Sequence, residues 1–161
     1  SLLFWTQSLS GNIALVSYSL IDRLPRTLLT SHVKASTSAF PVAECNCSVA
    51  RLQLDGNFAV DTTEAEPERV FFTTQHHEIW ASDLNGCRCW KKMSSPESTE
   101  LAITSLAVGS RAIYWVTQDV DRSKIYTAAK SSGDILSVYR GFSLTKVVPY
   151  DEQSQPYSGK L

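Results

Sequence analysis

Two closely spaced cysteine pairs, Cys45-x-Cys47 and Cys87-x-Cys89, have the clearest chemical potential in this 161-residue chain. Four thiolates would satisfy tetrahedral zinc, but recurrent zinc sites place about two to four residues between paired cysteines. Residues i and i+2 of a strand face the same way, so two facing strands can be joined between the pairs. A bond within one pair would close a strained small ring. We expect at least one disulfide between the pairs, Cys45–Cys89 or Cys47–Cys87, with zinc and free buried thiols as alternatives.

The triplet Asn46-Cys47-Ser48 matches the acceptor pattern for N-glycosylation, although such triplets also occur by chance. Disulfides and N-linked glycans both belong to oxidising, extracellular compartments. The cysteine pairs and Asn46 together therefore predict an extracellular location.

Other polar clusters are weaker candidates for chemistry. His76 and His77 precede Glu78, but adjacent residues of an extended chain point to opposite faces and cannot easily share one metal ion. The run 119–122 lacks the glycine and later glutamate of a helix-loop-helix calcium site. We expect solvated turns at both places. No nucleophile elbow, phosphate loop or Ser-His-Asp signature is present, so we predict no catalytic, metal or cofactor site.

An acidic run extends from Asp61 to Glu68 and includes Glu64 and Glu66. Runs of charge are usually solvated, so the simplest expectation is an exposed hairpin loop. The functional alternative is that Glu64, Glu66 and Glu68 face a protein partner.

The elements that must position these residues are repeated hairpins. An aromatic pair followed by polar residues occurs as Phe4-Trp5-Thr6-Gln7, Phe71-Phe72-Thr73-Thr74 and Tyr114-Trp115-Val116-Thr117. After each copy come a turn and a second β-rich run: Asn12–Leu20, Glu78–Leu84 and Lys124–Ala129. A repeated hairpin indicates one supersecondary unit built several times, and one member of each aromatic pair should face a neighbouring unit.

The spacing of the repeats predicts β-propeller blades. Phe72 and Trp115 are 43 residues apart, the length of one four-stranded blade of ~40–45 residues. Trp5 and Phe72 are 67 residues apart, and we place the excess in an insertion within Pro25–Ser48. The third unit predicts strands at 103–108, 112–118, 124–130 and 135–140, separated by turn residues. In the second unit, a fourth strand is expected at 87–93.

These motifs resemble the YWTD six-bladed β-propellers of the low-density-lipoprotein receptor class. The aromatic strand, the turn and the Leu84-Asn85-Gly86 ending carry the resemblance, together with the closing run Val147–Pro156, which ends in a Gln-Pro pair. The degenerate aromatic motifs are most similar to the propellers of Ros/Sevenless-class receptor tyrosine kinases. The acidic residue of the family motif is replaced here by Gln7, Thr74 and Thr117. We therefore expect blades to contact one another through the aromatic core and neutral hydrogen bonds.

The resemblance implies an all-β fold, the C-terminal half of a six-bladed propeller with four-stranded antiparallel blades. We predict blades at about 1–54, 55–93 and 94–141, a closing strand at 142–151 and an exit tail at 152–161. A half propeller has open edges, so we expect a segment of a longer chain.

The implied function is non-catalytic: an extracellular module of a single-pass cell-surface receptor that binds a protein ligand and neighbouring ectodomain modules. The parent chain would carry a tyrosine kinase elsewhere. The alternative is a propeller enzyme, a metal-dependent hydrolase or lactonase, whose site lies mostly in the other half. A net charge of −1 without a basic patch argues against nucleic acid. No apolar run approaches the ~20 residues of a membrane span, so no direct membrane insertion is expected.

Overall fold

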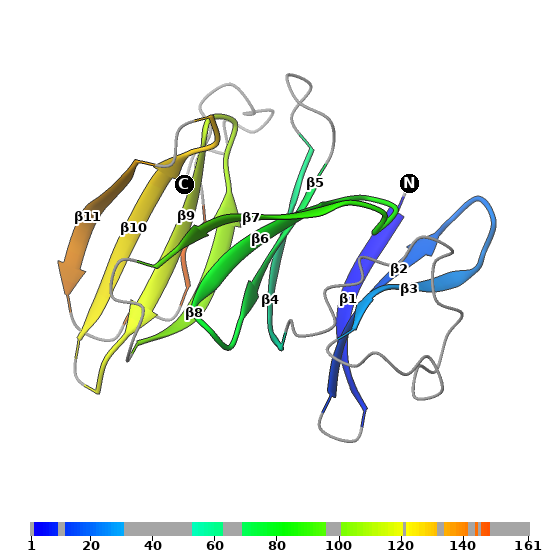
Figure 1. Ribbon diagram of the computed structural model, residues 1–161, viewed down its shortest axis with the longest axis horizontal. Helices are drawn as coiled ribbons and strands as arrows, with labels where there is room; N and C mark the ends of the chain where they lie inside the picture. Colours follow the sequence, from blue (N-terminus) through cyan, green and yellow to red (C-terminus); the bar gives the residue numbers. More distant parts are fainter. Residues whose placement is uncertain are drawn as a thin grey trace, which may run out of the picture.

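The computed structural model describes residues 2–9, 12–30, 53–62, 69–95, 101–120, 122–131, 134–141, 144 and 146–148. In these ranges the chain forms β-strands and turns and no helix. Three antiparallel sheets pack face to face, in the order in which they occur along the chain (Figure 1). The all-β prediction is confirmed, and the arrangement is consistent with part of a β-propeller.

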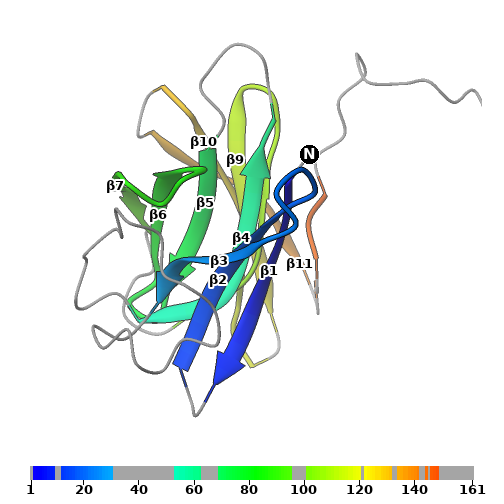
Figure 2. The same ribbon diagram turned by 90° about the vertical axis from the view of Figure 1, so that its right-hand side faces the viewer.

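Sheet A contains β1 (Leu2–Leu9), β2 (Asn12–Ser19) and β3 (Pro25–Thr30), in that spatial order. Figure 2 views the molecule from the side of this sheet, with sheet A in front. Pro25–Thr30 is a strand paired with β2, so an insertion within Pro25–Ser48 would begin only after Thr30. Proline at the first residue of an outer strand removes no needed ladder donor. The remainder of the predicted insertion, 31–48, lies outside the described residues.

Sheet B contains β4 (Leu54–Asp61), β5 (Arg69–Thr74), β6 (Glu78–Asp83) and β7 (Cys89–Ser94). Sheet C contains β8 (Ala102–Val108), β9 (Ala112–Gln118), β10 (Ser123–Ala129) and β11 (Ile135–Gly141). Both sheets follow the chain order of their strands, as blade meanders do. The predicted strand at 112–118 is matched residue for residue, whereas β7 begins two residues later than expected, at Cys89.

The pairing register is the same in all three sheets. The second aromatic residue of each motif lies opposite an equivalent residue of the next strand: Trp5 opposite Val16, Phe72 opposite Trp80, and Trp115 opposite Tyr126. Phe58 and Leu106 lie opposite Phe72 and Trp115 on the other side. Trp5, Phe72 and Trp115 therefore occupy equivalent positions, and any residue can be compared with its counterparts in the other sheets.

A β-bulge recurs at one position in the last strand of every sheet. The register shifts there leave one residue without a partner opposite: Leu28 in β3, Lys92 in β7 and Val138 in β11. Bulges re-aim side chains and increase strand twist. The motif residues predicted this unit as a hairpin, but nothing in their pattern predicted the bulge.

Two apolar cores fill the spaces between the sheets. One lies between sheets A and B and includes Leu15, Leu28, Val70 and Phe72. The other lies between sheets B and C and includes Phe71, Ile79, Met93, Ile113 and Trp115. The adjacent residues Phe71 and Phe72 thus enter different cores, because neighbours on a strand point to opposite faces. The ring of Trp115 stacks on that of Tyr126, with centroids 5.6 Å apart.

The predicted closing strand is described only at residue 144 and residues 146–148, which belong to no assigned strand. This segment nevertheless contacts sheet C. The amide of Leu144 donates to the Ser123 hydroxyl at 2.9 Å, and the amide of Val147 donates to the Ser105 hydroxyl at 3.2 Å. The tail 152–161 lies outside the described residues. Within the ranges given above, no helical segment has the length and apolar character of a membrane span.

Candidate functional site

Strand β4 is the element through which sheet B meets both neighbours. Phe58 and Val60 pack on the core toward sheet A, while Ala59 packs on the core toward sheet C. Asn57 and Asp61 share the parity of Ala59, so strand geometry directs all three toward sheet C. Asn57 and Asp61 are four positions apart along the strand, or ~13 Å at the usual rise. They therefore form two separate contacts with sheet C.

The contact at the end of β4 is a buried ion pair. The ammonium of Lys130, just after β10, lies 2.6 Å from a carboxylate oxygen of Asp61, and the two side chains are 4% and 1% exposed. The Lys130 carbonyl accepts a hydrogen bond from the Lys92 ammonium of β7, and its amide donates to the Arg111 carbonyl at 3.0 Å. Lys130 thus fastens the third sheet to two strands of the second. The expectation of only neutral hydrogen bonds between blades is wrong at this point.

The contact at the start of β4 joins the two sheets through a hydrogen bond between uncharged groups. The Asn57 side-chain amide donates to the Ile103 carbonyl of β8 at 2.9 Å. Asp55 orients Asn57, because its carboxylate accepts from the Asn57 backbone at 3.1 Å and from the Thr73 hydroxyl. Gly56, between them, has φ +100°, a conformation that side chains rarely adopt. This contact agrees with the predicted neutral hydrogen bonding.

The family that this chain resembles has an acidic residue at the motif position where this chain has Gln7, Thr74 and Thr117. Thr74 and Thr117 are buried, and within the described ranges their hydroxyls have no hydrogen-bond partner. Gln7 is half-buried. The charge that ties sheet B to sheet C comes instead from Asp61, at the end of the preceding strand.

Asp61 and Arg69 are opposite one another at the last rung of β4 and β5, and the acidic run connects them. The Arg69 guanidinium lies over the Trp90 ring, 5.4 Å from its centroid, a favourable cation–π geometry. The prediction of an exposed run from Asp61 is therefore wrong for Asp61 itself, which is buried. Glu64, Glu66 and Glu68 lie outside the described residues. The acidic run that carries them therefore starts at Asp61, held by Lys130, and leads to Arg69, held by Trp90.

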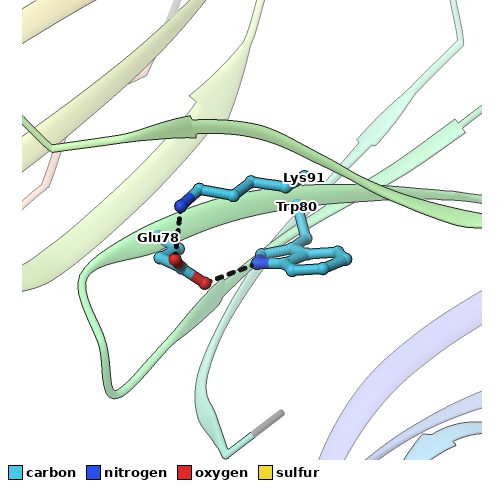
Figure 3. Close-up of polar contacts among 3 residues, drawn as sticks. All are labelled: Glu78, Trp80 and Lys91. Atoms are coloured by element: carbon cyan, nitrogen blue, oxygen red, sulfur yellow. Dashed lines mark hydrogen bonds and ion pairs between the residues drawn. The ribbon is translucent and has the colours of Figure 1, made fainter. Parts of the chain in front are cut away.

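A second polar cluster joins β6 and β7 (Figure 3). The Glu78 carboxylate accepts from the Trp80 indole nitrogen at 2.9 Å and pairs with the Lys91 ammonium at 2.5 Å. Partial burial acts to raise the pKa of Glu78, but the hydrogen bonds from Lys91 and Trp80, with the charges of Lys91 and His76, leave that pKa below its ordinary value. His76 and His77 form the preceding hairpin turn, as predicted, and His77 has φ 58°.

Cys87 and Cys89 lie at the turn into β7, and both are disulfide-bonded. Cys87 precedes the strand, and its amide donates to the Asp83 carboxylate at 2.7 Å. Cys45, Cys47 and Asn46 lie outside the described residues, so the pairing between the two cysteine pairs and the glycan at Asn46 stay predictions.

The described residues bring together structural contacts rather than reactive groups. In these ranges no group of three or more His, Cys, Asp or Glu side chains is placed to hold a metal ion. Sequence reasoning did not select Lys130 or Asn57. A sequence signal for the ion pair was nevertheless present. Lys130 takes the place of the neutral Leu84 of sheet B, and Asp61 takes the place of the neutral Gly109 of sheet C. A cation and an anion thus replace neutral residues at the two positions that form the pair.

Comparison with known proteins gives a consistent set of relatives. No protein-family model matches the chain. The chain is 30% identical over 161 residues to the human proto-oncogene tyrosine-protein kinase ROS, an alignment that covers 99% of the chain and 7% of the relative. It is 38% identical over 117 residues to the rat protein and 36% over 118 residues to the mouse protein, in each case covering 73% of the chain and 5% of the relative. The chain is thus homologous to a short segment of these ROS tyrosine-protein kinases.

Proposed function

We propose that the chain is a non-catalytic, extracellular β-propeller module of a ROS-like receptor tyrosine kinase and presents a surface for protein ligands. The observation that carries the proposal is the match to human ROS over nearly the whole chain, combined with three sheets of one repeated register. Kinase catalysis would reside elsewhere in such a receptor, because this segment is all-β and resembles a propeller.

The three repeated sheets have the features of a rigid scaffold. Two apolar cores fill the spaces between neighbouring sheets, and the ion pair of Asp61 and Lys130 adds a polar contact between sheets B and C. A rigid scaffold leaves turns and loops free to vary, which is where binding residues concentrate. We propose the acidic loop, with Glu64, Glu66 and Glu68, and the segment 31–48 as the surfaces that face a partner or neighbouring ectodomain modules.

The experiment is production of the 161-residue chain with a secretion signal in mammalian cells. We expect a secreted protein whose mass falls on treatment with an N-glycosidase and stays unchanged in an Asn46→Gln variant. Non-reducing peptide mapping should join Cys87 and Cys89 to Cys45 and Cys47. Four free thiols, or one zinc ion per chain by elemental analysis, would contradict the extracellular assignment.

Ligand presentation needs its own readout. The secreted chain should bind at least one member of a panel of purified extracellular proteins in surface plasmon resonance. The matched control is the same chain carrying Asp61→Asn and Lys130→Met, in which the anchored base of the acidic loop is disturbed. Absence of any binder for the folded chain would overturn ligand presentation, while secretion and disulfide mapping would still test the extracellular assignment.

A further inference from the structure

The turn between β2 and β3 carries two exposed aliphatic side chains (Figure 1, right). Ile21 is 82% exposed and Leu24 is 56% exposed. The β6–β7 and β10–β11 turns occupy equivalent places, because the flanking strands pair in the same register. These turns have exposed polar residues at the corresponding positions: Asn85 and Arg88 in sheet B, and Ser131 and Asp134 in sheet C. Aliphatic residues thus replace polar ones in the turn of sheet A.

The exposure of these two positions does not depend on whether a sheet has a neighbour. Sheet B packs against a sheet on each of its faces, and Asn85 and Arg88 are nevertheless exposed. Leu20 is different, because its counterpart Leu84 packs in the core between sheets A and B. We therefore leave Leu20 out and call Ile21 and Leu24 the aliphatic tip.

Hydrogen bonds close the turn that carries the aliphatic tip. The Arg23 amide donates to the Ser19 carbonyl at 2.8 Å, and the Ser19 amide donates to the Leu24 carbonyl at 3.4 Å. The Asp22 amide donates to the Ser19 hydroxyl at 3.1 Å. A surface that already has its binding conformation loses less entropy on association, so this closed turn is suited to anchor a partner.

The aliphatic tip lies at the same end of the sheets as Asp61, where the acidic run begins. Asp61 pairs with Lys130, at the start of the β10–β11 turn. The β2–β3 turn is the equivalent turn of sheet A. The aliphatic tip and the start of the acidic run therefore belong to one end of the scaffold.

Two guanidinium groups accompany the aliphatic tip, Arg23 within the turn and Arg26 shortly after it. Both side chains are exposed, and among the described residues neither has an ion-pair partner. Asp22 is the one acid in residues 20–26, so the segment carries one net positive charge. Guanidinium groups pair with carboxylates in a fixed, two-pronged geometry. A complementary surface would therefore be acidic around an apolar centre.

The same features favour a protein partner over a lipid surface. Stable attachment to a bilayer needs a large apolar area or several basic residues together. The aliphatic tip has two apolar side chains and one net positive charge. A protein recess, by contrast, can enclose a small apolar group completely, and such enclosed groups supply most of the binding energy at many interfaces.

We propose that the aliphatic tip inserts into an apolar recess of an extracellular protein, and that carboxylates at the rim of this recess pair with Arg23 and Arg26. This inference rests on the proposed ligand presentation and deepens it by naming a surface and the chemistry of its partner. Ile21 and Leu24 supply the binding energy, while the two arginines act mainly on approach and orientation.

The test is selection of peptides from a random phage-displayed library on the secreted chain. The library is first depleted on a chain that carries both Ile21→Asp and Leu24→Asp, which removes peptides that bind elsewhere. The remaining peptides should combine apolar residues with Asp or Glu. Synthetic copies of these peptides should bind Ile21→Asp ~30-fold more weakly than the unchanged chain in fluorescence polarisation.

Matched variants separate the apolar contribution from the charged one. Val120 is 91% exposed in the β9–β10 turn, so Val120→Asp should bind the peptides as the unchanged chain does. Arg23→Asn with Arg26→Gln should slow association and reduce its salt dependence. Asparagine is chosen because Arg23 has φ 55°, which asparagine tolerates. Far-ultraviolet circular dichroism verifies that every variant is folded.

Three results would overturn the proposal. The first is that no peptide survives depletion, and the second is that the surviving peptides are insensitive to the two arginine substitutions. The third is flotation of the unchanged chain, but not of Ile21→Asp, with phosphatidylcholine vesicles, which would assign the aliphatic tip to a lipid surface.

The proposed function has a separate outcome. A protein from the panel of extracellular ligands that binds the unchanged chain and Ile21→Asp equally would support ligand presentation and reject the aliphatic tip as its site. Loss of that binding in Ile21→Asp, with Val120→Asp unaffected, would support both.

Discussion

The Lys130 ammonium lies 2.6 Å from the Asp61 carboxylate, in a contact between two sheets where both side chains are almost fully buried. The two residues come from different repeats, and each replaces a neutral counterpart in the neighbouring repeat. Such a pair is costly to break from one side, because the remaining charge stays buried without compensation.

Asp61→Asn should lower the free energy of unfolding by about 3–5 kcal/mol. The double change Asp61→Leu with Lys130→Met should cost much less, since it leaves no buried charge. Guanidinium denaturation at neutral pH measures both. The matched control is Lys91→Met, which breaks the more exposed Glu78–Lys91 pair and should cost about 0–1 kcal/mol. Equal losses for Asp61→Asn and Lys91→Met would contradict the role given to burial.

The lowered pKa of Glu78 predicts that the folded protein loses stability in acid. Its pKa in the folded protein lies below the ordinary value of 4.5, so ionised Glu78 stabilises the fold above that pH. The contribution disappears as pH falls through the lowered folded-state pKa. Glu78→Gln should therefore be less stable than the unchanged chain at pH 7, and the gap should narrow towards pH 3. A constant gap in urea unfolding across this range would show that the charge of Glu78 is not responsible.

Gly86 is predicted to tolerate a methyl group poorly. Its φ is +69°, and a Cβ there would lie 2.7 Å from the Leu28 carbonyl oxygen. Gly86→Ala should lose about 1–2 kcal/mol from the left-handed conformation alone, plus the cost of displacing β3. Gly56→Ala is the control, because φ is +100° but the nearest atom is 3.7 Å away. Thermal unfolding should rank Gly86→Ala as the less stable variant; the reverse order would dismiss the close approach of β3.

The acidic loop predicts an effect on association with a protein ligand. Replacing Glu64, Glu66 and Glu68 with Gln should slow association and weaken its dependence on salt, because exposed charges act mainly on encounter rates. Stability should change little, as for most exposed side chains. Surface plasmon resonance at two salt concentrations measures the effect on an identified ligand. Unchanged association rates would remove the loop from the interface and leave the segment 31–48 as the candidate.

The repeat itself was readable from the chain. Alternating apolar residues and aromatic pairs predicted most strands because side-chain alternation is a local property of a strand. The equivalence of Trp5, Phe72 and Trp115 followed from the repeated aromatic motif, and the pairing register agrees with it. The strand at Pro25–Thr30 was missed because Ser, Thr, Pro and Cys nearby suggested an insertion.

The contacts between repeats depended on the tertiary structure. The buried state of Asp61 follows from Lys130, which is remote in sequence and near only because sheets B and C stack. The bulges at Leu28, Lys92 and Val138 exist only in relation to a partner strand, since a bulge is a mismatch between two strands. A linear pattern encodes which residues form a strand and which face they take. Which faces meet, and which polar groups lose water together, is decided by the packing of sheet on sheet.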